Sequence, residues 1–203
     1  MKPISGARQF PKLAVWLPLC CAFAALVMVT APVQAAGDPW SAESRWASVR
    51  IGSTGSGAQF APPGSVGIGF GYTFFLGNQV AASGTAGYDV LGRFGDATEI
   101  EMPFTVDFTK HFKFSESGRP YLGGGLGVVY HKLYRTGDDS SDFRQLIYMA
   151  VGGNAALDEL NLLGLDFRYT LEQNTRSINN TFPNPHAATS HWSLKFSYSR
   201  RFL

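Results

Sequence analysis

The 203-residue sequence predicts an all-β fold, an eight-stranded antiparallel up-and-down transmembrane β-barrel. Three observations predict it. The N-terminus carries an export signal, long segments alternate large apolar residues with small or polar ones, and no uncharged apolar run after the signal is long enough for a spanning helix. Only helices and closed barrels satisfy every backbone polar group in lipid, so a barrel is expected.

The first 36 residues have the features of a secretory signal peptide. Three basic residues lie among the first 12, residues 14–30 are uncharged and mostly apolar, and the small residues Ala35 and Ala36 end the segment. We expect cleavage after Ala35 or Ala36, which leaves residues 37–203 as the barrel. An uncleaved membrane anchor is the alternative, because the apolar run lies near the lower length limit of a spanning helix.

Removal of the signal changes what the composition implies. Both cysteines, Cys20 and Cys21, leave with it, so the mature chain has no disulfide and no thiol chemistry. The three basic residues leave too, which lowers the formal net charge from +2 to −1. We therefore expect no nucleic-acid partner.

Residues 64–76 give the clearest strand signal. The large apolar side chains from Val66 to Leu76 fall on one parity, and the other parity is mostly glycine, with Phe75 as its one large residue. Strand side chains alternate between two faces, so one face is large and apolar and the other is nearly bare. This pattern is typical of a strand between lipid and a narrow lumen.

Eight segments in all show this alternation with a period of two residues. They cover residues 45–55, 64–76, 79–91, 98–113, 120–134, 143–156, 162–173 and 190–203. In chain order, and leaving out 143–156, their apolar parities are marked by Val49 and Ile51, Phe70 and Tyr72, Tyr88 and Val90, Phe104 and Val106, Leu126 and Val128, Phe167 and Tyr169, and Phe196 and Tyr198.

Details within these strands give three further expectations. Phe70 and Phe104 lie centrally on their apolar parities and are expected to face lipid. Pro103 lacks a ladder donor and predicts a local irregularity. The facing of residues 143–156 stays open, because both of their parities are apolar.

The connections alternate in character. Those at 56–63, 92–97, 135–142 and 174–189 are longer or more polar, whereas the others are short, including a tight turn at Gly77-Asn78. Long loops at one end and short turns with both termini at the other match the outer and periplasmic ends of a barrel.

At this level the chain resembles the OmpA-like, opacity-type family of small outer-membrane barrels. Residues 120–127 resemble its glycine-rich fifth strand, and residues 163–169 resemble its seventh. The aromatic end of the last strand resembles the signal read by the barrel-insertion machinery, although Leu203 follows Phe202. The resemblance implies a monomer in the outer membrane that contacts outer-membrane lipid and lipopolysaccharide.

The polar parities predict a network of charged side chains in the lumen. Its members are Arg50, Asp89, Glu99, Glu101, Asp107, Asp166, Arg168, Glu172 and Lys195. Ionised groups in a narrow lumen must be paired or hydrated. We expect Arg168 and Lys195 to pair with some of the carboxylates Glu99, Glu101, Asp107, Asp166 and Glu172. A structural network is favoured over a pore lining, because side chains fill an eight-stranded interior.

Catalytic and metal chemistry is not expected. Lipid A deacylases, barrels with similar fifth and seventh strands, carry a His-x-Ser pair on the seventh strand, where this chain has Arg168 and Thr170. His186 and His191 are expected to be polar surface residues of the last loop rather than metal ligands. His111 and His131 have no ligand partner nearby in sequence, and no cofactor is expected.

The sequence thus favours a barrel with a structural or surface-interaction role. Contacts would use the loops at 56–63, 135–142 and 174–189, because loops on a rigid scaffold carry variable function. A small diffusion pore and a lipid A deacylase-like enzyme are the two alternatives.

Overall fold

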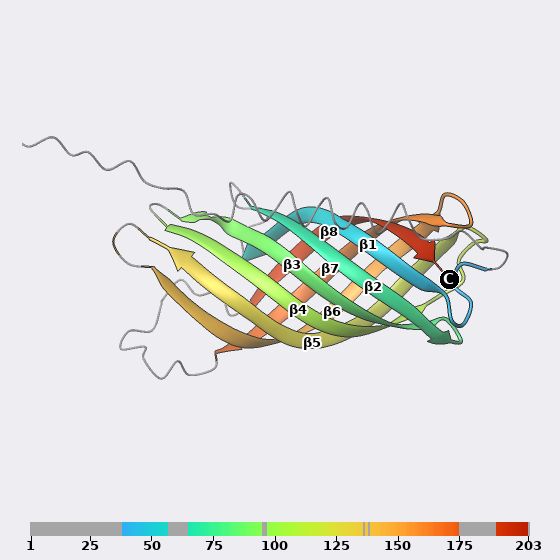
Figure 1. Cartoon of the computed structure of the whole chain (residues 1–203), viewed down its shortest axis with the longest axis horizontal. Coiled ribbons are helices and arrows are strands. Elements are labelled where there is room, and N and C mark those ends of the chain that lie inside the picture. The colour runs from blue at the N-terminus through green and yellow to red at the C-terminus, as the bar shows by residue number, and fades with distance from the viewer. Residues whose placement is uncertain are drawn as a thin grey trace, which may run out of the picture. The chain divides into compact units, whose positions relative to one another are not determined.

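The computed structural model describes residues 38–56, 65–94, 97–135, 137, 139–174 and 190–202. They form eight strands: β1 (Arg45–Ser56), β2 (Val66–Gly77), β3 (Val80–Phe94), β4 (Ala97–His111), β5 (Gly118–Tyr134), β6 (Ser140–Ala156), β7 (Asn161–Asn174) and β8 (Ser190–Phe202). Each strand pairs antiparallel with the next, and β8 pairs with β1 to close the barrel (Figure 1). The predicted fold class is confirmed. The expected signal peptide, residues 1–36, lies outside the described residues.

The two ends of the barrel differ in their connections. The turn end holds the β2–β3, β4–β5 and β6–β7 turns together with the start of β1 and the end of β8 (Figure 1). The loop end holds the other four connections. Among the described residues, no helix is long and apolar enough to cross a membrane.

Outward side chains form an exposed apolar surface on the barrel wall. They include Ile51, Tyr72, Phe104, Val106, Phe108, Leu126, Val128, Ile147, Met149, Leu165, Phe167, Tyr169, Leu171 and Phe196. In β6 the facing left open by the sequence is now assigned: Ile147 and Met149 point outward, whereas Leu146 and Tyr148 are buried in the lumen. Such a surface suits contact with lipid chains rather than water.

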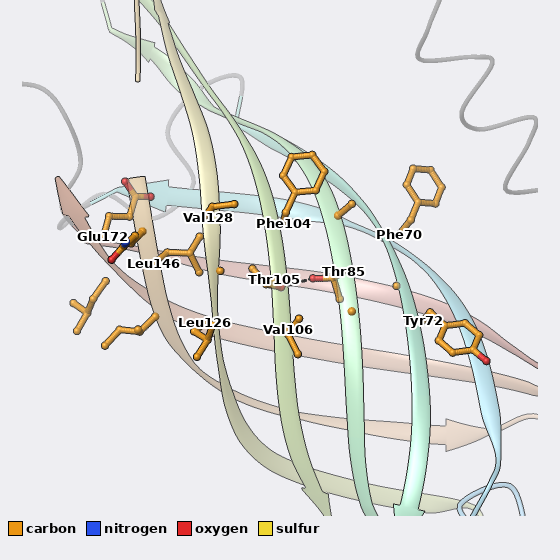
Figure 2. Close-up of a pocket in the computed structure, with 17 residues that line it drawn as sticks. Phe70, Tyr72, Thr85, Phe104, Thr105, Val106, Leu126, Val128, Leu146 and Glu172 are labelled. Carbon is orange, nitrogen blue, oxygen red and sulfur yellow. Dashed lines mark hydrogen bonds between the residues drawn. The ribbon is translucent and has the colours of Figure 1, made fainter. Parts of the chain in front are cut away.

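A shallow hollow lies on this outer surface. Phe70 and Tyr72 of β2 project on one side of β3, and Phe104 and Val106 of β4 project on the other (Figure 2). Between these two pairs of side chains β3 carries small residues. Ala86, for example, is the register partner of both Phe70 and Phe104. The hollow, about 1100 Å³ in volume, has a mostly apolar lining that contains neither histidine nor serine.

Phe104→Arg is expected to lower the free energy of unfolding by about 2–4 kcal/mol, because it places a charge in the lipid-facing band near its middle. The Phe104 side chain is 52% exposed on that surface. The measurement is the urea midpoint of protein refolded in lipid vesicles. Phe114→Arg is the control, since Phe114 lies in the β4–β5 turn with 84% exposure and should tolerate the charge. Equal midpoints for wild type and Phe104→Arg would contradict the assigned facing.

Several strand ends differ from those predicted. β3 continues to Phe94 and β4 begins at Ala97, so the loop expected at 92–97 shrinks to residues 95–96. β6 begins at Ser140, which shortens the loop expected at 135–142. In both places the strand pairing extends through residues that read as loop in the sequence. The remaining longer connections, at 57–65 and 175–189, lie almost entirely outside the described residues.

Two turns show the local chemistry of the turn end. The β2–β3 turn is centred on Asn78 and Gln79, one residue later than predicted; their φ values of 48° and 61° are those of a type I′ hairpin turn. In the β6–β7 turn Asp158 accepts hydrogen bonds from the side chain of Asn161 and the backbone of Leu160. These bonds lower the pKa of the Asp158 carboxyl.

The irregularity predicted at Pro103 lies in the β3–β4 ladder. Pairing is interrupted between the Ala86–Phe104 pair and the Asp89–Glu101 pair. At this break a Cβ added to Gly87 would lie 3.1 Å from Pro103 Cγ. Pro103 has no backbone N–H to donate to the ladder, and its ring lies beside Gly87, which together account for the break in pairing. A separate bulge follows at Val90–Gly92.

Candidate functional site

Lumen-facing glycines make room for charged side chains. A Cβ on Gly67 would collide with the carboxylate of Asp89, and one on Gly125 would lie only 2.7 Å from both Asp107 Cβ and Tyr148 Cζ. The bare face seen in the sequence is therefore space into which side chains of neighbouring strands project.

The middle of the lumen is held by Arg168. Its Nε donates to Asp166 Oδ1 at 2.6 Å and its Nη2 to Asp107 Oδ2 at 3.2 Å. Each carboxylate also accepts a tyrosine hydroxyl: Tyr121 on Asp166 at 2.6 Å and Tyr148 on Asp107 at 2.8 Å. The guanidinium lies 4.6 Å from the centre of the Tyr148 ring. Arg168 thus pairs with two of the carboxylates that the sequence offered as partners.

Lys195 has a different partner from those expected. Its Nζ donates to Asp89 Oδ1 at 2.5 Å, although Asp166 is the residue directly opposite it in the β7–β8 register. Asp89 belonged to the predicted network but not to the predicted partners of Lys195. Asp166 is already bound by Arg168 and Tyr121, so the ammonium reaches across the lumen to β3.

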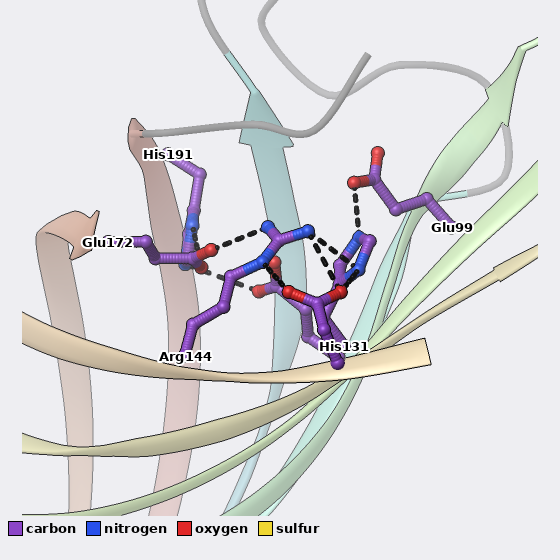
Figure 3. Close-up of polar contacts among 7 residues, drawn as sticks. Glu99, His131, Arg144, Glu172 and His191 are labelled. Atoms are coloured by element: carbon purple, nitrogen blue, oxygen red, sulfur yellow. Dashed lines mark hydrogen bonds and ion pairs between the residues drawn. The ribbon is translucent and has the colours of Figure 1, made fainter. Parts of the chain in front are cut away.

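A second network lies near the loop end and is centred on Arg144 of β6 (Figure 3). Arg144 Nη1 donates to Glu172 Oε2 at 2.9 Å, and its Nε donates to Asp142 Oδ2 at 2.7 Å. His131 Nδ1 lies 2.8 Å from Arg144 Nη2, and His131 Nε2 lies 2.6 Å from Glu99 Oε1. Glu101 and His191 complete this loop-end network, which places Glu99, Glu101 and Glu172 together.

Sequence reasoning missed four members of this network: His131, Asp142, Arg144 and His191. Arg144 lies on the strand whose facing was open. His191 lies in β8 with its side chain 8% exposed, so the expectation of a polar surface residue is wrong. His186 lies outside the described residues. Extending the glycine parity of β5 from Gly127 by four residues reaches His131 and would have placed it in the lumen.

The turn end of the lumen is closed by an apolar cluster. Trp40 and Trp46 pack with Phe75, Ala81 and Leu162, all at most 3% exposed. Trp40 precedes β1 and belongs to the leader, the described residues 38–44, which folds into the barrel mouth. Phe75, the large residue on the small parity of β2, points inward to meet it. This cluster was not predicted, because nothing in the leader alternates.

The leader is fastened by polar contacts as well. Trp46 Nε1 donates to the backbone oxygen of Pro39 at 3.1 Å. The Arg119 guanidinium lies 4.8 Å from the Trp40 ring centre, and its Nη2 lies 3.6 Å from Asp38 Oδ2. These contacts seat the leader across the turn end of the lumen.

The described lumen side chains leave small cavities between them. Two lumen cavities of about 50 Å³ each are lined in part by Arg50, the remaining member of the predicted network. One lies beside the tryptophan cluster and the other beside Lys195. Volumes of this size hold about one or two ordered waters. The described lumen is thus a packed interior of ion pairs and aromatic rings.

Comparisons with protein families and with curated proteins find no match. Solved structures do match. Neisserial surface protein A (NspA) has a TM-score of 0.60 and 12% identity, over 79% of this chain and 96% of that one. The N-terminal β-barrel domain of Pseudomonas aeruginosa OprF has a TM-score of 0.53 and 11% identity, over 77% and 97%. Ail, the attachment invasion locus protein of Yersinia pestis, has a TM-score of 0.53 and 12% identity, over 80% of this chain and 99% of that one. The chain therefore has the fold of small eight-stranded outer-membrane β-barrels.

Proposed function

We propose that this protein is a monomeric integral outer-membrane barrel with a structural or surface-interaction role, related to the OmpA-like, opacity-type barrels. The observation that carries the proposal is the filled lumen, in which the Arg168 ion pairs and the Trp40 cluster occupy the interior. The apolar outer wall supports a position among outer-membrane lipids and lipopolysaccharide. Insertion would use the aromatic C-terminal strand, and export would use the signal at residues 1–36.

The loop end is the proposed contact surface. The connections at 57–65 and 175–189 are the longest there, and loops on a rigid barrel tolerate the variation that recognition requires. NspA and Ail bear names that describe a surface protein and an attachment protein. A variant in which a short Gly-Ser turn replaces residues 175–189 separates the two roles. The variant should retain outer-membrane integrity against detergent in both cases. It should also retain cell attachment if the role is structural alone, and lose cell attachment if the loop makes the contacts.

A small diffusion pore is the alternative, and planar-bilayer recording distinguishes it. We expect the purified protein to give no conductance steps, or steps far smaller than those of a sixteen-stranded porin in the same bilayer, because side chains fill the lumen. Steps of porin size, with ion selectivity that shifts in Arg168→Ala while stability hardly changes, would favour the pore instead.

A lipid A deacylase is disfavoured by where the relevant side chains point. Arg168 and Thr170 lie in the lumen, and Arg168 is held by two carboxylates, whereas a lipid substrate would lie on the outer wall. Neither side chain is a base that could activate a hydroxyl. Incubation with lipopolysaccharide followed by mass spectrometry of lipid A checks this, and release of a 3-hydroxy fatty acid would overturn it.

A further inference from the structure

Three side chains able to bind a metal meet in the loop-end network. They are Glu101 of β4, Glu172 of β7 and His191 of β8, and one ligand atom from each lies within 4.8 Å of the other two. His191 Nε2 is 3.7 Å from Glu101 Oε2, and His191 Nδ1 is 3.2 Å from Glu172 Oε1. Figure 3 shows Glu172 and His191 converging from adjacent strands. Closure of the barrel brings these ligands together from three separate strands.

The potential ligand atoms are poorly supplied with hydrogen-bond donors. Among the described residues, both carboxylate oxygens of Glu101 accept no hydrogen bond, and Glu172 Oε1 and His191 Nδ1 have only their 3.2 Å contact with each other. Glu101 is 1% exposed, and the Glu172 side chain is 1% exposed. Two ionised carboxylates this close repel each other, and buried polar atoms without partners cost free energy. A cation bound between the carboxylates, or a proton shared by them, would offset this repulsion.

We propose that Glu101, Glu172 and His191 bind a divalent transition-metal ion, with Zn²⁺ as the ion best suited to this donor set. One imidazole nitrogen and two carboxylate oxygens are three protein ligands of the kind Zn²⁺ accepts, with a fourth position left for water. The site would link β4, β7 and β8 across the lumen.

Neighbouring groups support this use of the carboxylates. Arg144 donates to Glu172 Oε2, which fixes that carboxylate and leaves Oε1 facing His191, as outer partners orient ligands in metal sites. Among the described residues, the loop-end network contains four carboxylates, those of Glu99, Glu101, Asp142 and Glu172, and one guanidinium, that of Arg144. A divalent cation offsets the excess negative charge that remains when the imidazoles are neutral.

The test is a Zn²⁺ titration by isothermal calorimetry, with protein extracted from membranes into detergent and stripped of metal with EDTA. We expect one ion per chain, and an affinity lowered by about tenfold or more in Glu101→Gln, Glu172→Gln and His191→Asn. Titration with Co²⁺ should give a visible absorption spectrum that these variants lose. Heat-dependent migration on SDS gels checks that each barrel is folded, and if Glu101→Gln does not fold, His191→Asn carries the same expectation.

Two histidine controls localise the ion. His111→Asn removes another buried lumen histidine, near the turn end, and should bind Zn²⁺ as the wild type does. His186→Asn removes a histidine of the long last connection and should also retain binding. Absence of Zn²⁺ and Co²⁺ binding by the wild type would mean that the carboxylates share a proton, and the proposal would be wrong. It would also be overturned if binding survived in Glu101→Gln or disappeared in His186→Asn.

Discussion

Arg168→Met is expected to lower the free energy of unfolding of the barrel by about 3–5 kcal/mol, the loss typical of a buried ion pair deprived of one partner. The substitution keeps most of the side-chain volume but leaves Asp107 and Asp166 without their shared cation. Both carboxylates are almost fully buried, so water cannot replace the guanidinium. The measurement is the urea midpoint of unfolding in lipid vesicles.

Rescue and control variants separate charge from packing. Adding Asp107→Asn and Asp166→Asn to Arg168→Met removes the unpaired charges and should recover most of the lost stability. Lys113→Ala breaks an ion pair with Glu116 in the exposed β4–β5 turn and should leave the midpoint unchanged. An Arg168→Met midpoint equal to that of the wild type would show that the lumen pairs are hydrated and contribute little.

Trp40→Ala is expected to lower the free energy of unfolding by about 3–5 kcal/mol, because the indole fills the turn end of the lumen and is 2% exposed. Removing it leaves a cavity beside Trp46 and Phe75 and takes away the face against which Arg119 lies. The urea midpoint again measures the effect.

Phe114→Ala is the matched control for this prediction. Phe114 is an aromatic residue at the same end of the barrel with 84% exposure, so its removal should leave the midpoint unchanged. If Trp40→Ala were as stable as Phe114→Ala, the leader would not be part of the folded core, and closure of the turn end would need another explanation.

Period-two alternation predicted most of the fold. It located all eight strands and assigned outward faces to seven of them, because the direction of a strand side chain depends only on its parity. The same parity placed Arg168 and Asp166 on one face of β7, where the structure finds them bonded. Parity gave no answer in two places: β6 is apolar on both faces, so its facing stayed open, and the leader does not alternate.

By itself, therefore, the sequence determined the strands, the outward and lumen faces of seven of them, and nine of the charged side chains that point inward. Only the tertiary structure decided which charges meet. Lys195 binds Asp89 at a separation of 106 residues, and Glu101, Glu172 and His191 come together from three strands. Contacts across a lumen depend on the stagger of strands around the closed barrel, which is a property of the whole sheet. Alternation fixes a side chain's face but not its height along the axis, so the partners appear only once the barrel is closed.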